Sequence, residues 1–181
     1  MGRWREKDGG SGGRIPGASK GTPNRDVVEG RSITGIPREL LFARLADVER
    51  FPEWGYGLRR ARLLPASDVS SVPEAHGGLH PGSRIEFGLR AAGIEHRVTS
   101  LVTEVEPPRL IEWRYLSGAS GYGGWMLEET GESVRMTLST DYSVEPPWLD
   151  RLAHRPSFRR LISDLMGRSL RRLVEGLKRE F

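Results

Sequence analysis

The chain has 181 residues and a formal net charge of +4, with 28 Lys and Arg against 24 Asp and Glu. This length suits one domain with a hydrophobic core and is short for two. The sequence has no cysteine, which excludes disulfides, thiolate nucleophiles and cysteine-ligated zinc. No apolar run approaches the roughly 20 residues that span a bilayer, and no secretion signal follows Met1. We therefore expect a cytoplasmic protein without a membrane span.

The first 26 residues are rich in Gly, Ser, Pro and charge. Such a segment buries too little apolar surface to offset its chain entropy, which predicts a disordered tail and a domain over residues 27–181. Val27 to Ile36 is typical of a strand. Pro37 fits the first position of a short helix, and Asp47 is placed to cap a second short helix that ends before Gly57.

The middle of the chain reads as an antiparallel meander. Tyr56 to Leu64 predicts a strand, and the long Pro- and Gly-rich stretch from Pro65 to Gly82 predicts a loop whose residues 65–81 are a candidate lid. Five further strands are predicted by short runs bounded by turn residues, namely Ser83–Ala91, Ile94–Val105, Arg109–Ser117, Tyr122–Glu129 and Ser133–Val144. The glycine-rich run from Gly118 to Gly124 joins two strands, which favours a turn with a glycine bend over a phosphate-binding loop.

Alternation of apolar and polar residues assigns the inner face of these strands. The inward positions are Ile85, Phe87 and Leu89; Ile111, Trp113 and Tyr115; Trp125 and Leu127; and Val134, Met136, Leu138, Thr140 and Tyr142. The run from Ile94 to Val105 changes parity. Ile94, Val98 and Val102 share one parity, whereas Leu101 and Val105 share the other. A β-bulge in this strand is the expected explanation.

The last segment predicts a long amphipathic helix that runs to the C-terminus. Its apolar side comprises Phe158, Leu161, Ile162, Leu165, Met166, Ser169, Leu173, Val174 and Leu177. Its other side is strongly basic. A solvated surface is the first interpretation of that basic side, and docking to nucleic acid or to an anionic membrane is the alternative.

Several phrases resemble one known family. IPRELLFARLADVERFPEW from Ile36 to Trp54 resembles the opening of START-like (SRPBCC) polyketide cyclase/dehydrase domains. Pro81 and Gly82 resemble the entry into the third strand of that family, VTEVEPPRLIEWRY from Val102 to Tyr115 resembles its Val-x-Glu-x-x-Pro-Pro-Arg-x-x-x-Trp stretch, and Gly124, Trp125 and Leu127 resemble the next strand. The resemblance extends from Val27 to Phe181. It implies an α+β helix-grip fold of the START/Bet v 1 type, with six to seven antiparallel strands curved around the C-terminal helix and two short helices after the first strand.

The resemblance also implies a deep cavity between the sheet and the last helix. In different members this cavity holds lipids, polyketides or other hydrophobic molecules, and some members catalyse cyclisation or dehydration. The residues expected to bind such a ligand are Phe87, Leu89, His96, Val98, Trp113, Tyr115, Trp125, Leu127, Met136, Leu138, Tyr142, Leu161 and Leu165. A small hydrophobic ligand is thus the expected partner of a monomer or homodimer, with no cofactor.

Evidence for catalysis in the residues themselves is limited to a few polar side chains. His96 faces the interior if its strand parity points inward, and then it and Tyr115 are candidates for proton transfer. Arg84 is a candidate only if it points inward to hold a carboxylate. His76 and His80 lie among Pro and Gly residues, where their spacing has no helical meaning, and no metal site is expected there. A hydrophobic-ligand carrier is therefore the first hypothesis, and an aromatase/cyclase-type enzyme is the second.

Overall fold

The computed structural model describes residues 27–65, 78–91, 93–153 and 155–180. The predicted tail, and residues 66–77 of the predicted lid, lie outside these ranges. The elements in chain order are β1 (Val27–Thr34), α1 (Arg38–Ala46), η1 (Val48–Arg50), α2 (Phe51–Trp54), β2 (Leu58–Leu64), β3 (Arg84–Ala91), β4 (Ile94–Glu106), β5 (Leu110–Ser117), β6 (Ala119–Thr130), β7 (Ser133–Val144), α3 (Pro147–Ala153) and α4 (Pro156–Arg179). In this part of the chain, no helix is long and apolar enough to cross a membrane.

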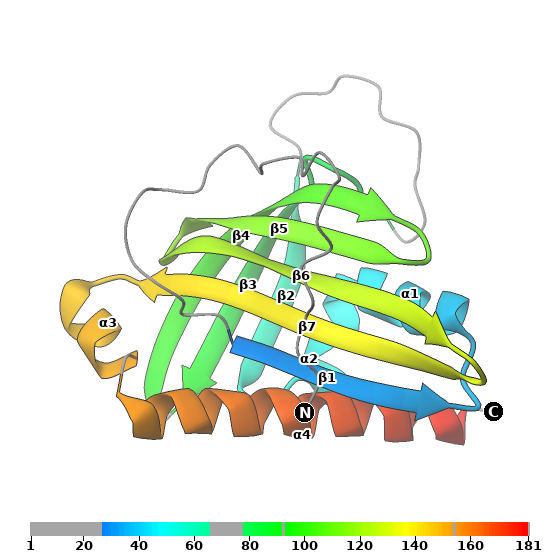
Figure 1. The fold of residues 1–181 in the computed structure, drawn as a ribbon. Helices are drawn as coiled ribbons and strands as arrows, with labels where there is room; N and C mark the ends of the chain where they lie inside the picture. The colour runs from blue at the N-terminus through cyan, green and yellow to red at the C-terminus, as the bar shows by residue number, and fades with distance from the viewer. Residues whose placement is uncertain (1–26, 66–77, 92, 154, 181) are drawn as a thin grey trace, which may run out of the picture.

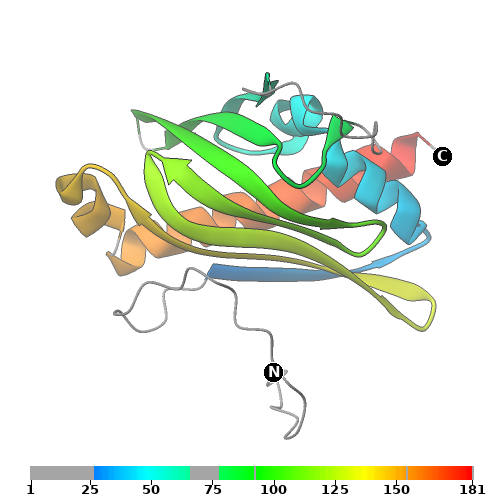
Figure 2. The same cartoon turned by 90° about the horizontal axis from the view of Figure 1, so that it is seen from above.

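The strands form one antiparallel sheet in the order β1-β7-β6-β5-β4-β3-β2. The sheet curves around α4, which runs along its concave side (Figures 1 and 2). The short helices α1 and α2 follow β1 and cover one end of that side (Figure 1). This arrangement confirms the expected α+β helix-grip fold.

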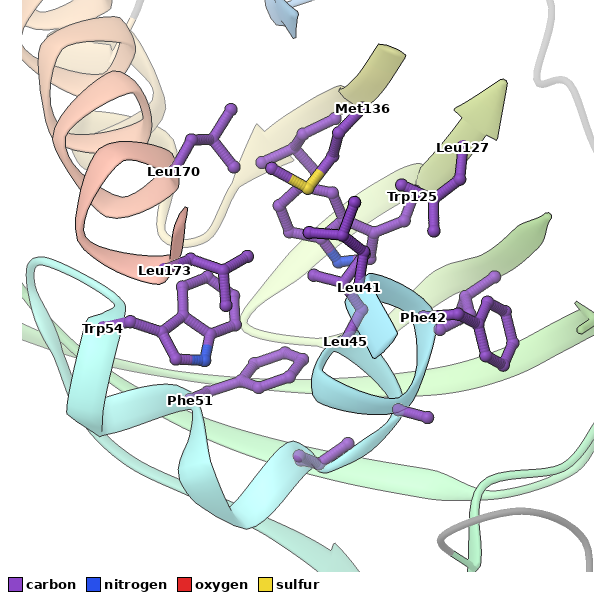
Figure 3. Close-up of a cluster of buried hydrophobic side chains, with 14 of the residues drawn as sticks. Leu41, Phe42, Leu45, Phe51, Trp54, Trp125, Leu127, Met136, Leu170 and Leu173 are labelled. Carbon is purple, nitrogen blue, oxygen red and sulfur yellow. The ribbon is translucent and has the colours of Figure 1, made fainter. Parts of the chain in front are cut away.

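The C-terminal half of α4 supplies the side chains that fix the helix on the sheet. Leu170, Leu173 and Leu177 are at most 1% exposed and belong to the central hydrophobic cluster. Figure 3 shows Leu170 and Leu173 pointing toward the aromatic and aliphatic side chains of the sheet and the short helices. Each fully buried leucine contributes about 1.5–3 kcal/mol, so this half of the helix holds the architecture together.

Two helix-start predictions need correction. Pro37 occupies the N-cap position of α1 rather than its first helical residue. Asp47 precedes η1, which leads into α2, but its side chain makes no capping hydrogen bond. The burial of Leu41, Phe42 and Leu45 in the core explains why α1 forms without a strong cap, since packing of an apolar face outweighs local signals.

The run from Gly118 to Gly124 is not a turn, contrary to the prediction. Only Gly118 lies between β5 and β6, and the rest of the run is strand. A Cβ on Gly118 would lie 2.0 Å from the Arg97 carbonyl oxygen, and a Cβ on Gly123 would lie 2.7 Å from the Trp113 indole. These glycines therefore allow a neighbouring carbonyl and a neighbouring ring to come close to the backbone, a role that glycine also plays within strands.

The expected bulge in β4 is confirmed. The pairing of β4 with β5 shifts register between Val102 and Glu104. Before this shift Val98, Ser100 and Val102 are buried on the inner face, and after it Val105 packs against the core. The extra residue thus changes the parity of the inward positions, as a bulge does.

The helix α3 was not predicted. Pro146 and Pro147 do end the sheet, but Pro147 also begins α3, where the missing proline N–H costs nothing. The carboxylate of Asp150 in α3 accepts a hydrogen bond of 3.0 Å from the Val144 N–H. This contact ties the start of α3 to the end of β7.

Replacement of Gly118 by alanine is expected to destabilise the fold more than replacement of Gly131. Both glycines have positive φ, 76° and 62°, which costs an L-residue about 1–2 kcal/mol. A Cβ on Gly131 meets nothing within 4 Å, whereas a Cβ on Gly118 overlaps the Arg97 carbonyl. Urea unfolding of Gly118→Ala and Gly131→Ala measures the difference, and equal losses in free energy of unfolding would contradict this account.

Candidate functional site

A cavity of about 320 Å³ lies between the concave face of the sheet, the α2–β2 turn and the N-terminal half of α4. Its walls are almost entirely apolar. The lining residues are Leu45, Val48, Phe51, Trp54, Gly55, Tyr56, Gly57, Leu58, Leu79, Ile85, Phe87, Leu89, Arg90, Ile94, His96, Val98, Ile111, Trp113, Tyr115, Ala119, Trp125, Leu138, Thr140, Tyr142, Val144, Phe158, Ile162, Leu165, Met166 and Ser169. The size and the lining are those of a small-molecule site.

The two halves of α4 have different neighbours, and this difference creates the cavity. Phe158, Ile162 and Leu165 in the N-terminal half are only half-buried and line the cavity. Leu170 and Leu173, one or two turns later, are fully buried in the core. The apolar stripe of one continuous helix therefore packs the core at one end and roofs a cavity at the other.

Aromatic rings form a connected wall at the inner end of the cavity. The ring centroids of Phe51 and Trp54 are 4.8 Å apart, and those of Phe51 and Phe87 are 6.0 Å apart and stacked. Trp54 meets Trp125 edge-on at 6.2 Å. Such pairs hold one another in place, so this wall is rigid before any ligand arrives.

A short chain of hydrogen bonds interrupts the apolar lining. The Tyr115 hydroxyl lies 2.7 Å from Thr140 Oγ1, which in turn lies 3.3 Å from the Tyr122 carbonyl oxygen. Because the carbonyl can only accept, the Thr140 hydroxyl donates to it and Tyr115 donates to Thr140. Burial raises the pKa of the Tyr115 phenol above its ordinary value, while the contact with Thr140 partly opposes that rise. Tyr115 is therefore a neutral donor at physiological pH.

His96 faces the cavity from β4. Its Nε2 atom lies 2.6 Å from the carbonyl oxygen of Gly118, at the turn between β5 and β6. Since a carbonyl oxygen only accepts, Nε2 carries a hydrogen. In the neutral ring Nδ1 is then the basic nitrogen, so His96 can accept a proton only at Nδ1.

The rim of the cavity is closed by backbone contacts around the α2–β2 turn. The Arg90 N–H donates to the Gly57 carbonyl at 2.7 Å. The Tyr56 N–H donates to Ser169 Oγ at 2.8 Å, and the Ser169 hydroxyl donates to the Leu165 carbonyl at 2.7 Å. Ser169 thus binds the turn to α4 at the point where the helix changes from cavity roof to core.

The cavity contains most of the ligand-binding residues proposed from the sequence. Those that line it are Phe87, Leu89, His96, Val98, Trp113, Tyr115, Trp125, Leu138, Tyr142 and Leu165. The other three do not line it. Leu127 and Met136 are fully buried in the core because the packed half of α4 covers their end of the sheet, and Leu161 is turned away beside Ile162.

The remaining polar candidates lie elsewhere. Arg84 is exposed on β3 and does not line the cavity, so the inward orientation that its candidate role required is not present. His80 contacts the Pro81 carbonyl through Nδ1 at 2.9 Å, and His76 lies outside the described residues.

Four lining residues were not predicted from the sequence as part of the site, namely Leu45, Val48, Leu79 and Ile162. The apolar spacing of the first helix was a signal for the first two.

The free energy of unfolding is expected to fall as pH rises above 10. Burial raises the pKa of Tyr115 and also that of Tyr142, where a charge on Tyr115 adds repulsion. The unfolded chain then releases protons that the folded chain retains, so alkali favours unfolding. Urea unfolding from pH 8 to 11 should show a shallower fall in Tyr115→Phe and Tyr142→Phe than in the unaltered protein. An equally steep fall in both variants would contradict the assignment.

The fold is shared with solved structures of low sequence identity. A START superfamily protein from Mycobacterium smegmatis matches with a TM-score of 0.65 and 11% identity, over 86% of this chain and 99% of that one. The Zhui aromatase/cyclase from Streptomyces sp. R1128 matches with a TM-score of 0.60 and 18% identity, over 86% and 94%. The major latex-like protein 151 from Panax ginseng matches with a TM-score of 0.60 and 12% identity, over 83% and 95%.

At these sequence identities the likeness shows a common fold and gives no information about activity. No curated protein matches the sequence. A family model described as polyketide cyclase / dehydrase and lipid transport matches residues 25–181, which includes every described strand and helix. The chain therefore belongs to the polyketide cyclase/dehydrase and lipid transport family, as a START-like helix-grip domain.

Proposed function

We propose that the chain binds a small, largely apolar molecule, such as a lipid or a polyketide-like compound, in the cavity under α4. The observation that carries the proposal is the cavity of about 320 Å³ with an apolar and aromatic lining. Pockets of this size bury most of the surface of a small ligand. Burial of apolar ligand surface at about 25 cal/mol per Å² supplies the affinity.

The polar groups of the cavity would orient the ligand rather than attract it. The His96 ring on β4, the Tyr115 hydroxyl on β5 and Thr140 Oγ1 on β7 all line the cavity from the sheet. A ligand hydroxyl can donate a hydrogen bond to the Tyr115 oxygen or to His96 Nδ1 at this wall, and the hydrocarbon part of the ligand faces Trp125 and Phe87. The family description, which includes lipid transport, supports this reading.

Filling the cavity is expected to abolish binding of a neutral hydrophobic probe. Ile162 lines the cavity from α4, so Ile162→Trp places an indole in the space that a ligand needs. Leu116 on β5 is 38% exposed and lies outside the lining, which makes Leu116→Trp the matched control. We expect affinity for N-phenyl-1-naphthylamine, measured by its fluorescence, to fall at least about tenfold in the first variant and to stay unchanged in the second.

Equal affinity in both variants, or no binding by the unaltered protein, would overturn the proposed cavity function. Native mass spectrometry of protein purified from its own host provides an independent measurement. A stoichiometric small molecule that is lost in Ile162→Trp would identify the ligand class. Its retention in that variant would place the ligand elsewhere.

A second candidate function is loss of water from a β-hydroxy carbonyl compound held in the same cavity. Two observations favour it: His96 has a basic nitrogen left after its bond to Gly118, and Tyr115 is a neutral acid nearby in the lining. His96 would take the proton from the α-carbon at Nδ1 as the double bond forms, and Tyr115 would turn its O–H away from Thr140 to protonate the departing hydroxyl and give water. Return of the proton from His96 to the Tyr115 phenolate would restore both residues. The structural likeness to an aromatase/cyclase is in keeping with such chemistry.

His96→Gln separates the two functions, because the amide still donates to the Gly118 carbonyl but cannot act as a base. If the chain is a dehydrase, this variant should lose at least about 100-fold in kcat on a β-hydroxy ketone. Its affinity for N-phenyl-1-naphthylamine should stay within about twofold. If the chain only binds, no water is lost with either protein. Turnover that is undiminished in His96→Gln would contradict the catalytic assignment.

A further inference from the structure

A second concavity lies beside the cavity, between the C-terminal half of α4 and the helices α1 and α2. Its volume is about 510 Å³, and its lining is mostly polar. We call it the arginine groove, and its residues are Arg44, Glu53, Trp54, Tyr56, Arg168, Arg171, Arg172, Leu173, Glu175, Gly176, Arg179 and Glu180. Trp54 and Tyr56 also line the cavity, so the two spaces share one wall.

The spacing of the α4 residues in the groove follows from helical periodicity. Arg168, Arg171, Arg172, Glu175 and Arg179 recur every three or four residues, which places them along one side of the helix. From Arg168 to Arg179 this side extends roughly 16 Å at 1.5 Å per residue. The groove is thus lined by a row of guanidinium groups, with one carboxylate among them.

Most of the negative charge in the groove is already neutralised. Glu180 pairs with Arg44 at 2.5 Å and with Arg50 at 3.8 Å, and Glu53 pairs with Arg50 at 2.9 Å. In contrast, among the described residues no carboxylate lies within 4.0 Å of the guanidinium of Arg168, Arg171 or Arg179. These three arginines leave the groove with uncompensated positive charge.

The shape of the groove leaves room for a compact anion. Gly176 has no side chain, and a Cβ placed there would meet no atom within 4 Å. Arg172 lies over the Tyr56 ring, with its guanidinium carbon 5.6 Å from the ring centroid. A cation held against an aromatic face keeps its outer N–H groups available to a ligand, so the wall is partly organised in advance.

We propose that the arginine groove binds a phosphate group. Planar guanidinium groups match phosphate oxygens with paired hydrogen bonds, and several arginines around one hollow suit an anion that carries up to two charges. A single carboxylate would leave most of the positive charge unmatched.

This site is independent of the proposed cavity function and takes a different chemistry. The test uses inorganic pyrophosphate as the probe, with isothermal titration calorimetry of the full chain at low salt. Arg168→Gln/Arg171→Gln removes two unpaired cations from the groove without touching the ion pairs of Glu53 and Glu180. Arg114→Gln/Arg135→Gln removes the same two charges from exposed positions on β5 and β7 and serves as the matched control.

The double variant is expected to lose at least about tenfold in affinity for pyrophosphate, since hydrogen bonds to charged groups are worth more than neutral ones. Arg114→Gln/Arg135→Gln should bind as the unaltered protein does. Absence of pyrophosphate binding would leave a lipid phosphate as the one remaining source. Binding to phosphatidic acid vesicles, lost in the double variant, would then support the site.

Three results would overturn the proposal. One is equal loss of affinity in Arg114→Gln/Arg135→Gln, which would indicate a diffuse effect of net charge. The second is equal binding to phosphatidylserine and phosphatidic acid vesicles of the same surface charge without pyrophosphate binding, which would indicate a general anionic surface. The third is binding of neither pyrophosphate nor vesicles. Far-UV circular dichroism of the same samples checks that each variant is folded, and binding of N-phenyl-1-naphthylamine reports separately on the cavity.

Discussion

The packing of the C-terminal half of α4 on the concave face of the sheet is the constraint on which the rest of this structure depends. Leu170, Leu173 and Leu177 fix the helix axis against Trp54 and the strands. A helix anchored at one end has its other end placed as well, so the N-terminal half of α4 lies over the cavity. The cavity is the space between the sheet and the helix that this geometry leaves unfilled.

Much of the fold follows from local patterns that a single strand or helix carries. Ile85 and Phe87 alternate with charged neighbours, and this alternation fixes which face of β3 looks inward. The phrases around Trp54 and Trp113 place these strands and helices in a known order. Alternation also located Tyr115 on the inner face, whereas the change of parity between Ile94 and Val105 left the direction of His96 open, and the structure places it in the cavity lining.

Alternation in the sequence shows which face of the sheet a residue is on. It does not show whether the residue lies beneath the packed C-terminal half of α4 or beneath the half that covers the cavity. Leu127 and Met136 have the inward parity of true cavity residues, yet they lie where the helix fills the space. Glycine content misled for a related reason. Gly123 is typical of a turn, but it lies in β6, where any side chain would overlap the Trp113 indole. Both errors concern contacts between segments distant in sequence, which no local pattern encodes.

The pairing of β1 with β7 has a consequence for how the chain reaches this structure. Val27 lies opposite Thr140, so the first strand to be made finds its partner only after more than a hundred further residues have been added. The hairpins from β3 to β7 join neighbours in the chain and cost little loop entropy, whereas closure of β1 on β7 is long-range. The meander can therefore assemble first, and β1 and α4 complete the domain together at the end of the process.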